Sequence, residues 1–281
     1  MRKYIGLLIV IFYSGLVYSQ NLVLNHSFED YEECPDEVTI DSKKELVPNW
    51  YMPNRGTTDY FNSCAFHQVN VPDNVMGHMF ALDGNAYTGI ILIEQPPAYS
   101  KNKRPMNYRE YLQTELKTPL KKDSLYWIQF YFSIASYSTY AFNKLGLWIS
   151  EEPIANRLSS KVLEAEPQII LDTNKIFNDR DNWCQVCDTF RALGDEEYIT
   201  IGNFSDDYHT EVEEFDNSMY RGTIQQTIEE NKIAYYYIDF VSVTHVSDTL
   251  NNYCENKFLV KAKEEPEWLL YYSDYILSNP F

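Results

Sequence analysis

The chain has 281 residues and a formal net charge of −18 at pH 7, from 41 acidic and 23 basic side chains. So large a negative excess, with no basic cluster to offset it, repels nucleic acids and anionic lipids and excludes nucleic acid as a partner. After the N-terminal segment no apolar run is long enough to cross a bilayer, so we predict no membrane span.

Residues 1–19 predict a secretory signal peptide. Two basic residues precede an apolar stretch from Gly6 to Val17, and a small-residue cleavage site ends at Ser19. Cleavage there makes Gln20 the first residue of the mature chain. We therefore expect an exported protein that is periplasmic, outer-membrane-associated or secreted.

From residue 20 onward the sequence predicts short β-strands. Apolar and polar side chains alternate along residues 126–134 and 145–150, as they do in strands with one buried face. Further candidate strands are residues 86–93, 183–187, 197–204 and 235–243. Turn-rich segments separate them, and βαβ alternation is absent. This pattern predicts an all-β jelly-roll β-sandwich as one domain over residues 20–246.

A C-terminal tail, residues 247–281, follows this domain and differs from it in character. Its residues 267–277 predict one short helix with several apolar side chains. We expect the helix to pack back on the domain, and the alternative is that it presents an apolar face to a partner.

Aromatic side chains stand on the predicted outward faces of two strands. Trp127 and Tyr131 alternate with core positions along one strand, and Gln129 lies between them. Trp148 points outward from a second strand that reads as its neighbour. Exposed rings stack on sugars while nearby polar groups select hydroxyls, so these four residues are the predicted ligand-binding site. Strands favour Trp and Tyr in any case, and an ordinary sheet surface covered by a loop is the alternative.

No constellation for catalysis stands out. Cys184 and Cys187 form a C-x-x-C pair in a segment that reads as a strand, without the further ligands of a zinc site or the helix of a redox motif. The acids single out no glycosidase pair, the five histidines are scattered, and no glycine-rich phosphate loop occurs. We therefore predict that the protein is not an enzyme.

Two acids near opposite ends of the mature chain form a candidate metal site. Glu29 follows a short apolar run, and Asp239 interrupts a strand. A buried carboxylate needs a cation, hydrogen-bond donors or a proton. If the terminal strands are neighbours, the two acids meet around one ion, for which calcium is the candidate; otherwise backbone N–H groups satisfy each acid separately. Alternation places Asp239 on one face with four residues that read as core side chains: Tyr235, Tyr237, Val241 and Val243.

Nine short strings, in order along the chain, resemble one family. They are NLVLNHSFEDYEECP, PNWY, TTDYFNSC, DGNAYTGI, REYLQTEL, PQII, DNW, EEYITIGNF and YYYIDFVSV. Together they look like the galactose-binding-like jelly-roll domains of exported Bacteroidetes cell-envelope proteins, which often precede an outer-membrane-protein-A-like peptidoglycan-binding domain. More distantly they resemble calcium-bearing carbohydrate-binding modules. The resemblance covers nearly the whole mature chain except the tail.

The resemblance implies a structural Ca²⁺ ion that joins the terminal strands. By position, Glu29 and Asp239 supply side chains and Ser27 supplies a backbone carbonyl. A loop carbonyl near Gly84 completes the site. Phe240 replaces the second acid of the family's closing pair and, by alternation, faces away from the ion.

The resemblance also implies a disulfide between Cys34 and Cys64, which lie in the two strings that match best. Such a bond would pin the loop that carries Trp50 and Tyr60 against the N-terminal strand, and export permits it. The function implied is that of an exported, non-catalytic module that binds a glycan or another cell-envelope component. The alternative is a structural or protein-interaction module of the envelope that binds no sugar.

Overall fold

The computed structural model describes residues 20–37, 47–95, 106–172, 176–215, 232–247 and 259–261. The predicted signal peptide and the predicted helix of the tail lie outside these ranges. Among the described residues, no helix has the length and apolar character needed to span a lipid bilayer.

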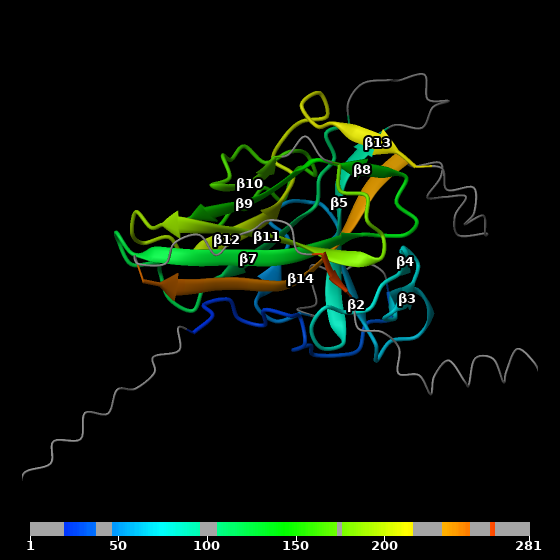
Figure 1. The fold of residues 1–281 in the computed structure, drawn as a ribbon, viewed down its shortest axis with the longest axis horizontal. Coiled ribbons are helices and arrows are strands. Elements are labelled where there is room, and N and C mark those ends of the chain that lie inside the picture. Colours follow the sequence, from blue (N-terminus) through cyan, green and yellow to red (C-terminus); the bar gives the residue numbers. More distant parts are fainter. Residues whose placement is uncertain are drawn as a thin grey trace, which may run out of the picture.

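Two antiparallel sheets pack face to face around the main core (Figure 1). The five-stranded sheet, in order, contains β1 (Trp50–Tyr51), β6 (Tyr111–Glu115), β12 (Tyr198–Gly202), β9 (Lys144–Ser150) and β10 (Ile169–Asp172). The six-stranded sheet, in order, contains β15 (Leu259–Lys261), β11 (Asn182–Arg191), β7 (Leu125–Ile134), β14 (Lys232–Val246), β5 (Ala86–Gln95) and β2 (Asp59–Asn62).

Three short elements lie beside the sheets. They are the ribbon of β8 (Tyr140–Phe142) with β13 (Val212–Glu214), the ribbon of β3 (Asp73–Asn74) with β4 (Gly77–His78), and the 3₁₀-helix η1 (His67–Val69). The described residues contain no α-helix, and the predicted all-β jelly-roll β-sandwich is confirmed.

The core between the sheets follows the predicted alternation. The side chains that β7 buries there are Tyr126, Ile128, Phe130, Phe132 and Ile134; those buried from β9 and β12 are Leu145, Leu147, Ile149, Ile199 and Ile201. Each of these side chains is at most 3% exposed. Complete burial of one large apolar side chain contributes about 1.5–3 kcal/mol, so this layer is the main source of stability.

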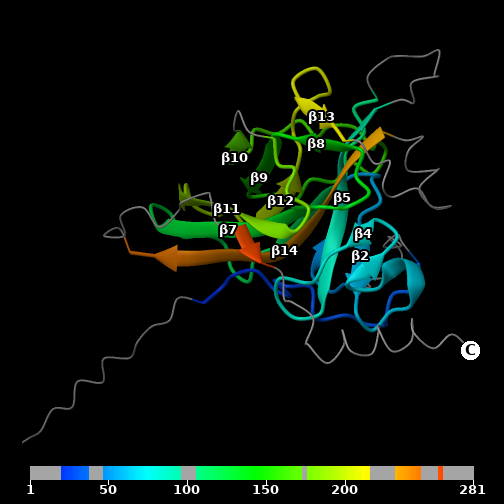
Figure 2. The same ribbon diagram turned by 45° about the vertical axis from the view of Figure 1, so that its right-hand side comes forward.

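A second apolar cluster lies on the outer face of the six-stranded sheet. Tyr235 and Tyr237 of β14 and Trp183 of β11 are at most 1% exposed there. They pack against the segment from Phe61 to Tyr87, which carries η1, β3 and β4 beside β2 and β5 (Figure 2). The Tyr237 ring meets the Phe61 ring edge-on, with centroids 5.6 Å apart. Strand β14 is therefore buried on both faces at this end.

Strand β14 changes faces at a β-bulge. Its register against β7 shifts between Asp239 and Ser242, where Phe240 adopts a left-handed φ of 48°. Val241 and Val243 therefore point into the core between the sheets, whereas Asp239 points to the opposite face. The prediction that all three share one face was wrong, because strict alternation does not survive the extra residue of a bulge. The predicted burial of Asp239 is confirmed, with 0% of it exposed.

The N-terminal segment lies along the end of β14. The backbone N–H of Leu22 donates to the carbonyl of Val243 at 2.8 Å, and the N–H of Val241 donates to the carbonyl of His26 at 2.8 Å. The two ends of the domain are thus neighbours, which was the condition for Glu29 and Asp239 to meet.

The disulfide between Cys34 and Cys64 is present, with the two Cα atoms 5.9 Å apart. Cys187 is also disulfide-bonded. Cys184, on the same strand, is a half-buried free thiol. Burial raises the pKa of this thiol to about 11, so it is a poor nucleophile at neutral pH.

Removal of the Cys34–Cys64 bond, by serine at both positions, is expected to lower the free energy of unfolding by about 3 kcal/mol. The bond spans a sequence separation of 30 residues, and its loss frees the unfolded chain more than the folded one. Urea unfolding of the oxidised proteins measures the difference. Cys184→Ser is the control and is expected to change stability by less than about 1 kcal/mol. Equal stability of the double variant and the parent protein would contradict the prediction.

Candidate functional site

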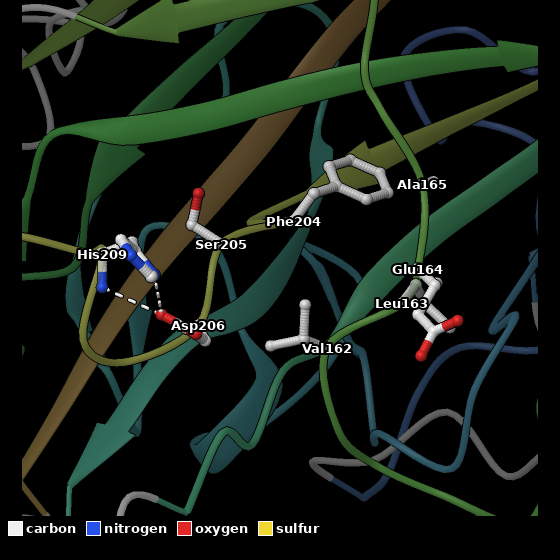
Figure 3. Close-up of a pocket in the computed structure, with 8 residues that line it drawn as sticks. All are labelled: Val162, Leu163, Glu164, Ala165, Phe204, Ser205, Asp206 and His209. Atoms are coloured by element: carbon white, nitrogen blue, oxygen red, sulfur yellow. Dashed lines mark hydrogen bonds and ion pairs between the residues drawn. The ribbon is translucent and has the colours of Figure 1, made fainter.

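A pocket of about 360 Å³ opens beyond the end of β12, beside the five-stranded sheet (Figure 3). Two loops face each other across it: one precedes β10, and the other follows β12. The lining residues are Val162, Leu163, Glu164 and Ala165 from the first loop, and Phe204, Ser205, Asp206 and His209 from the second.

Glycines let the Phe204 ring lie against the outer face of the sheet. Gly146 of β9 and Gly202 of β12 are paired in register on this face. A Cβ at Gly146 would lie 3.1 Å from Phe204 Cδ2, and a Cβ at Gly202 would overlap the ring of Tyr111. The rings of Tyr111 and Phe204 pack together with centroids 5.2 Å apart. The aromatic wall of the pocket therefore depends on two positions without side chains.

Asp206 and His209 form a polar pair at the rim. Asp206 Oδ1 accepts hydrogen bonds from His209, from ring Nδ1 at 2.6 Å and from the backbone N–H at 2.9 Å. Partial burial alone would raise the pKa of Asp206, but these hydrogen bonds outweigh it and lower the pKa below its ordinary value. Glu164 brings an exposed carboxylate from the facing loop. The rim thus offers two carboxylates and an imidazole.

A buried arginine holds the Asp206 loop from beneath. Arg109 is 0% exposed, and its guanidinium donates to Asp207 Oδ1 at 2.8 Å and to the Ser205 carbonyl at 2.7 Å. Asp207 Oδ2 also accepts from the backbone N–H of Asn107 at 2.9 Å. A buried ion pair adds little net stability, because desolvation offsets its attraction. Its clear effect here is geometric: it fixes both neighbours of Asp206.

The structure separates the four predicted ligand-binding residues onto two sheets. Trp127, Gln129 and Tyr131 lie on the outer face of β7, whereas Trp148 lies on β9 in the other sheet. Because the sheets pack face to face, these outward side chains point to opposite sides of the molecule. The interpretation of the two strands as neighbours was wrong, since alternation identifies an outward face without identifying its sheet.

The β7 surface remains a predicted ligand-binding surface without Trp148. Its rings are partly exposed. Gln129 Oε1 accepts a hydrogen bond from Gln185 Nε2 at 2.7 Å, and the Tyr131 ring meets Phe240 with centroids 6.0 Å apart. Burial raises the pKa of Tyr131.

Trp148 shares the outer face of the five-stranded sheet with the pocket. It lies two residues after Gly146 on β9, and the register carries a row from it through Thr200 and Gln113 to Tyr51. Both aromatic side chains in this row are partly exposed. Thr200 and Gln113 between them are 0% exposed, and both amide atoms of Gln113 are hydrogen-bonded to the backbone of Ile154. Trp148 therefore lies on the same sheet face as the pocket, and a loop separates it from Tyr51.

The predicted calcium ligands meet at one loop, residues 82–86. Asp239 Oδ2 accepts from two backbone N–H groups of this loop at 2.9 and 3.1 Å. Glu29 Oε1 accepts from two others at 2.7 and 2.9 Å. Ser27 Oγ donates to Asp83 Oδ2 at 2.7 Å. The loop thus bridges the two acids that lie far apart in sequence.

Backbone N–H groups occupy positions around the carboxylates that the resemblance assigns to calcium. These N–H hydrogens point at carboxylate oxygens whose lone pairs a calcium ion would need. Within the described part of the chain, no three His, Cys, Asp or Glu side chains are placed to hold a metal. The calcium site stays a prediction from the sequence.

Sequence reasoning missed the pocket. Residues 162–165 and 204–209 are about forty positions apart, and neither segment carries a regular apolar pattern. One local signal was available: paired acids, an aromatic residue and a histidine in a turn-rich stretch directly after a strand, Gly202–His209. Nothing in one sequence indicates which loop faces it.

Comparisons with known proteins were made by sequence and by structure. No protein-family model matches the chain, and no curated protein matches it. The xylan-binding CBM22-1 domain of Paenibacillus barcinonensis Xyn10C is 12% identical, covering 81% of this chain and 96% of that one, with a TM-score of 0.36. TmCBM61, solved with β-1,4-galactotriose, is 11% identical, covering 81% and 100%, with a TM-score of 0.32.

The K1 cleaved adhesin domain of the Lys-gingipain of Porphyromonas gingivalis W83 is 13% identical, covering 72% of this chain and 92% of that one, with a TM-score of 0.31. Likeness at these levels assigns neither a ligand nor a site to the chain.

Proposed function

We propose that the chain is an exported, non-catalytic carbohydrate-binding module whose ligand occupies the pocket. The observation that carries the proposal is the pocket's combination of an aromatic wall, Phe204, with rim carboxylates from Asp206 and Glu164. A sugar ring has an apolar face that stacks on aromatic side chains and hydroxyl groups that donate to carboxylates.

The ligand we propose is longer than one sugar. The partly exposed ring of Trp148 lies two residues from Gly146 on the sheet face that carries Phe204. Two residues of a strand span about 7 Å, so a second sugar unit can reach this ring. A cell-envelope glycan is the proposed source.

Export is supported by the predicted signal peptide and by the disulfide between Cys34 and Cys64. Disulfides persist in oxidising compartments and are rare in the cytosol. Three buried acids have clearly raised pKa values: Asp59, Glu110 and Asp239. None of them is among the side chains that line the pocket, which supports a non-catalytic role for it.

Phe204→Ala is expected to weaken glycan binding by about 1–3 kcal/mol, the range for truncation of an aromatic anchor. The ligand is first found by screening the mature chain on a glycan array, and calorimetry then gives the dissociation constants. Trp148→Ala should weaken the binding of an oligosaccharide more than that of a monosaccharide.

Trp127→Ala is the matched control, because it removes a partly exposed tryptophan from the opposite side of the sandwich. Loss of binding in this variant, with Phe204→Ala unaffected, would place the site on the β7 surface instead. A protein that binds no glycan on the array would support the alternative, a structural or protein-interaction module.

A further inference from the structure

The side chains that line the pocket give it a negative charge. Glu164 and Asp206 bring carboxylates, and the lining contains neither lysine nor arginine. The imidazole of His209 is hydrogen-bonded to Asp206 through Nδ1. A ligand in the pocket therefore meets acceptors and negative charge, with no fixed positive charge to receive an anion.

The basic side chains near the pocket do not change this balance. Arg109 is fully buried, and its guanidinium is already engaged by Asp207 and by the carbonyls of Tyr108 and Ser205. Lys161 precedes the first loop in sequence and is exposed, but it is not a lining side chain.

Further acids surround the site. Glu94 is partly buried, and burial together with the charge of Asp207 raises its pKa. Glu166 follows the first loop and is exposed. The surroundings therefore reinforce the negative charge of the rim.

From this geometry we infer that the pocket selects neutral and amino sugars and rejects sugars that carry a carboxylate, sulfate or phosphate group. The inference rests on the proposed function and concerns the same site. Hydroxyl and ammonium groups donate hydrogen bonds to the two rim carboxylates, whereas an anionic substituent is repelled and finds no cation.

The test uses matched glycans that share ring stereochemistry and linkage and differ in one substituent. Each is prepared as the neutral sugar, the 2-amino sugar and the uronic acid, in both the gluco and the galacto series. We expect the neutral or amino form to bind at least about tenfold more tightly than the uronic acid. This difference in affinity should become smaller at high salt, since screening weakens the repulsion between the uronic acid and the rim carboxylates.

Variants that remove one carboxylate charge show which acids cause the preference for neutral and amino sugars. Glu164→Gln and Asp206→Asn should each reduce the preference for neutral and amino sugars over uronic acids. Asp188→Asn, which removes an exposed acid from β11 of the other sheet, should leave this preference unchanged. Equal or tighter binding of the uronic acid would overturn the inference and leave glycan binding intact. Failure of every form in both series to bind would overturn the proposed function, and the inference with it.

Discussion

Asp239→Ala is expected to lower the free energy of unfolding by about 3–5 kcal/mol, because it removes the acceptor of three backbone N–H groups in a buried site. These donors belong to Leu82, Asp83 and Phe240, at 2.9, 3.1 and 2.7 Å. Burial raises the pKa of Asp239, so the carboxyl group depends on these donors for its place in the interior. Without it, the loop that follows Ala81 loses its attachment to β14.

Urea unfolding of the variant and the parent protein measures this loss. Glu213→Ala, an exposed acid on β13, is the control and should change stability by less than about 0.5 kcal/mol. A loss of under 1 kcal/mol in Asp239→Ala would show that the hydrogen bonds around the bulge are not important for stability.

The parent protein and a second variant, Asp239→Asn, test calcium. If Asp239 and Glu29 hold an ion, calcium should raise the melting temperature, chelator should lower it, and Asp239→Asn should abolish the difference. Identical melting curves with calcium and with chelator, on metal-free protein, would show that backbone N–H groups alone satisfy the two acids. The observed hydrogen bonds favour this second result.

The stability of the parent protein is expected to fall by about 3 kcal/mol as the pH rises from 4.5 through 7. Burial raises the pKa of Glu110 from 4.5 to about 7, and burial and the charge of Glu110 also raise that of Asp59. The folded state therefore keeps a proton that the unfolded chain releases. This contribution is complete below pH 4.5 and is lost as the pH passes 7, at about 1.4 kcal/mol per pKa unit.

The groups that face the two acids are neutral hydrogen-bond donors. Glu110 accepts from the Tyr108 hydroxyl at 2.6 Å and from the backbone N–H of Ile91 at 2.7 Å. Asp59 accepts from the Tyr235 hydroxyl at 2.5 Å. No basic side chain is hydrogen-bonded to either acid among the described residues, so the neutral donors offset only part of the cost of burying both charges.

Urea unfolding at pH 5 and pH 8 tests this expectation. Glu110→Gln should reduce the pH dependence without abolishing it, because Asp59 and Asp239 also have raised pKa values. The amide does not replace every hydrogen bond, so the variant should be less stable at pH 5. Glu115→Gln removes an exposed acid from the end of β6, the strand that follows Glu110, and should leave the slope of stability against pH unchanged. A parent protein whose stability is flat or rises over this interval would refute the prediction.

Periodicity was enough to predict two central strands, β7 and β9, and their core faces. Residues 126–134 and 145–150 alternate clearly, and their side chains lie in the core as expected. The physical reason is local: successive side chains of a strand point to opposite faces, and an apolar face must be buried. The disulfide between Cys34 and Cys64 was reached through the family resemblance, since five cysteines alone left several pairings open.

The bulge at Phe240 shows where periodicity ends. A period of two predicts a continuous face, but one extra residue reverses it, and a bulge has no strong local signature unless glycine occupies the left-handed position. Here phenylalanine does, with a φ of 48°. The face of Asp239 was therefore decided by its contacts with the 82–86 loop and not by its place in the pattern.

By itself the sequence determined the all-β class, the inward side chains of the central strands and the burial of Asp239, because these depend on neighbours within one segment. Only the tertiary structure decided that Trp127 and Trp148 lie on opposite sides of the sandwich, and that two distant loops form the pocket around Phe204. Both features depend on which strands pair and on how the two sheets pack. Such contacts join residues far apart in sequence, so they produce no periodic pattern that a single sequence would show.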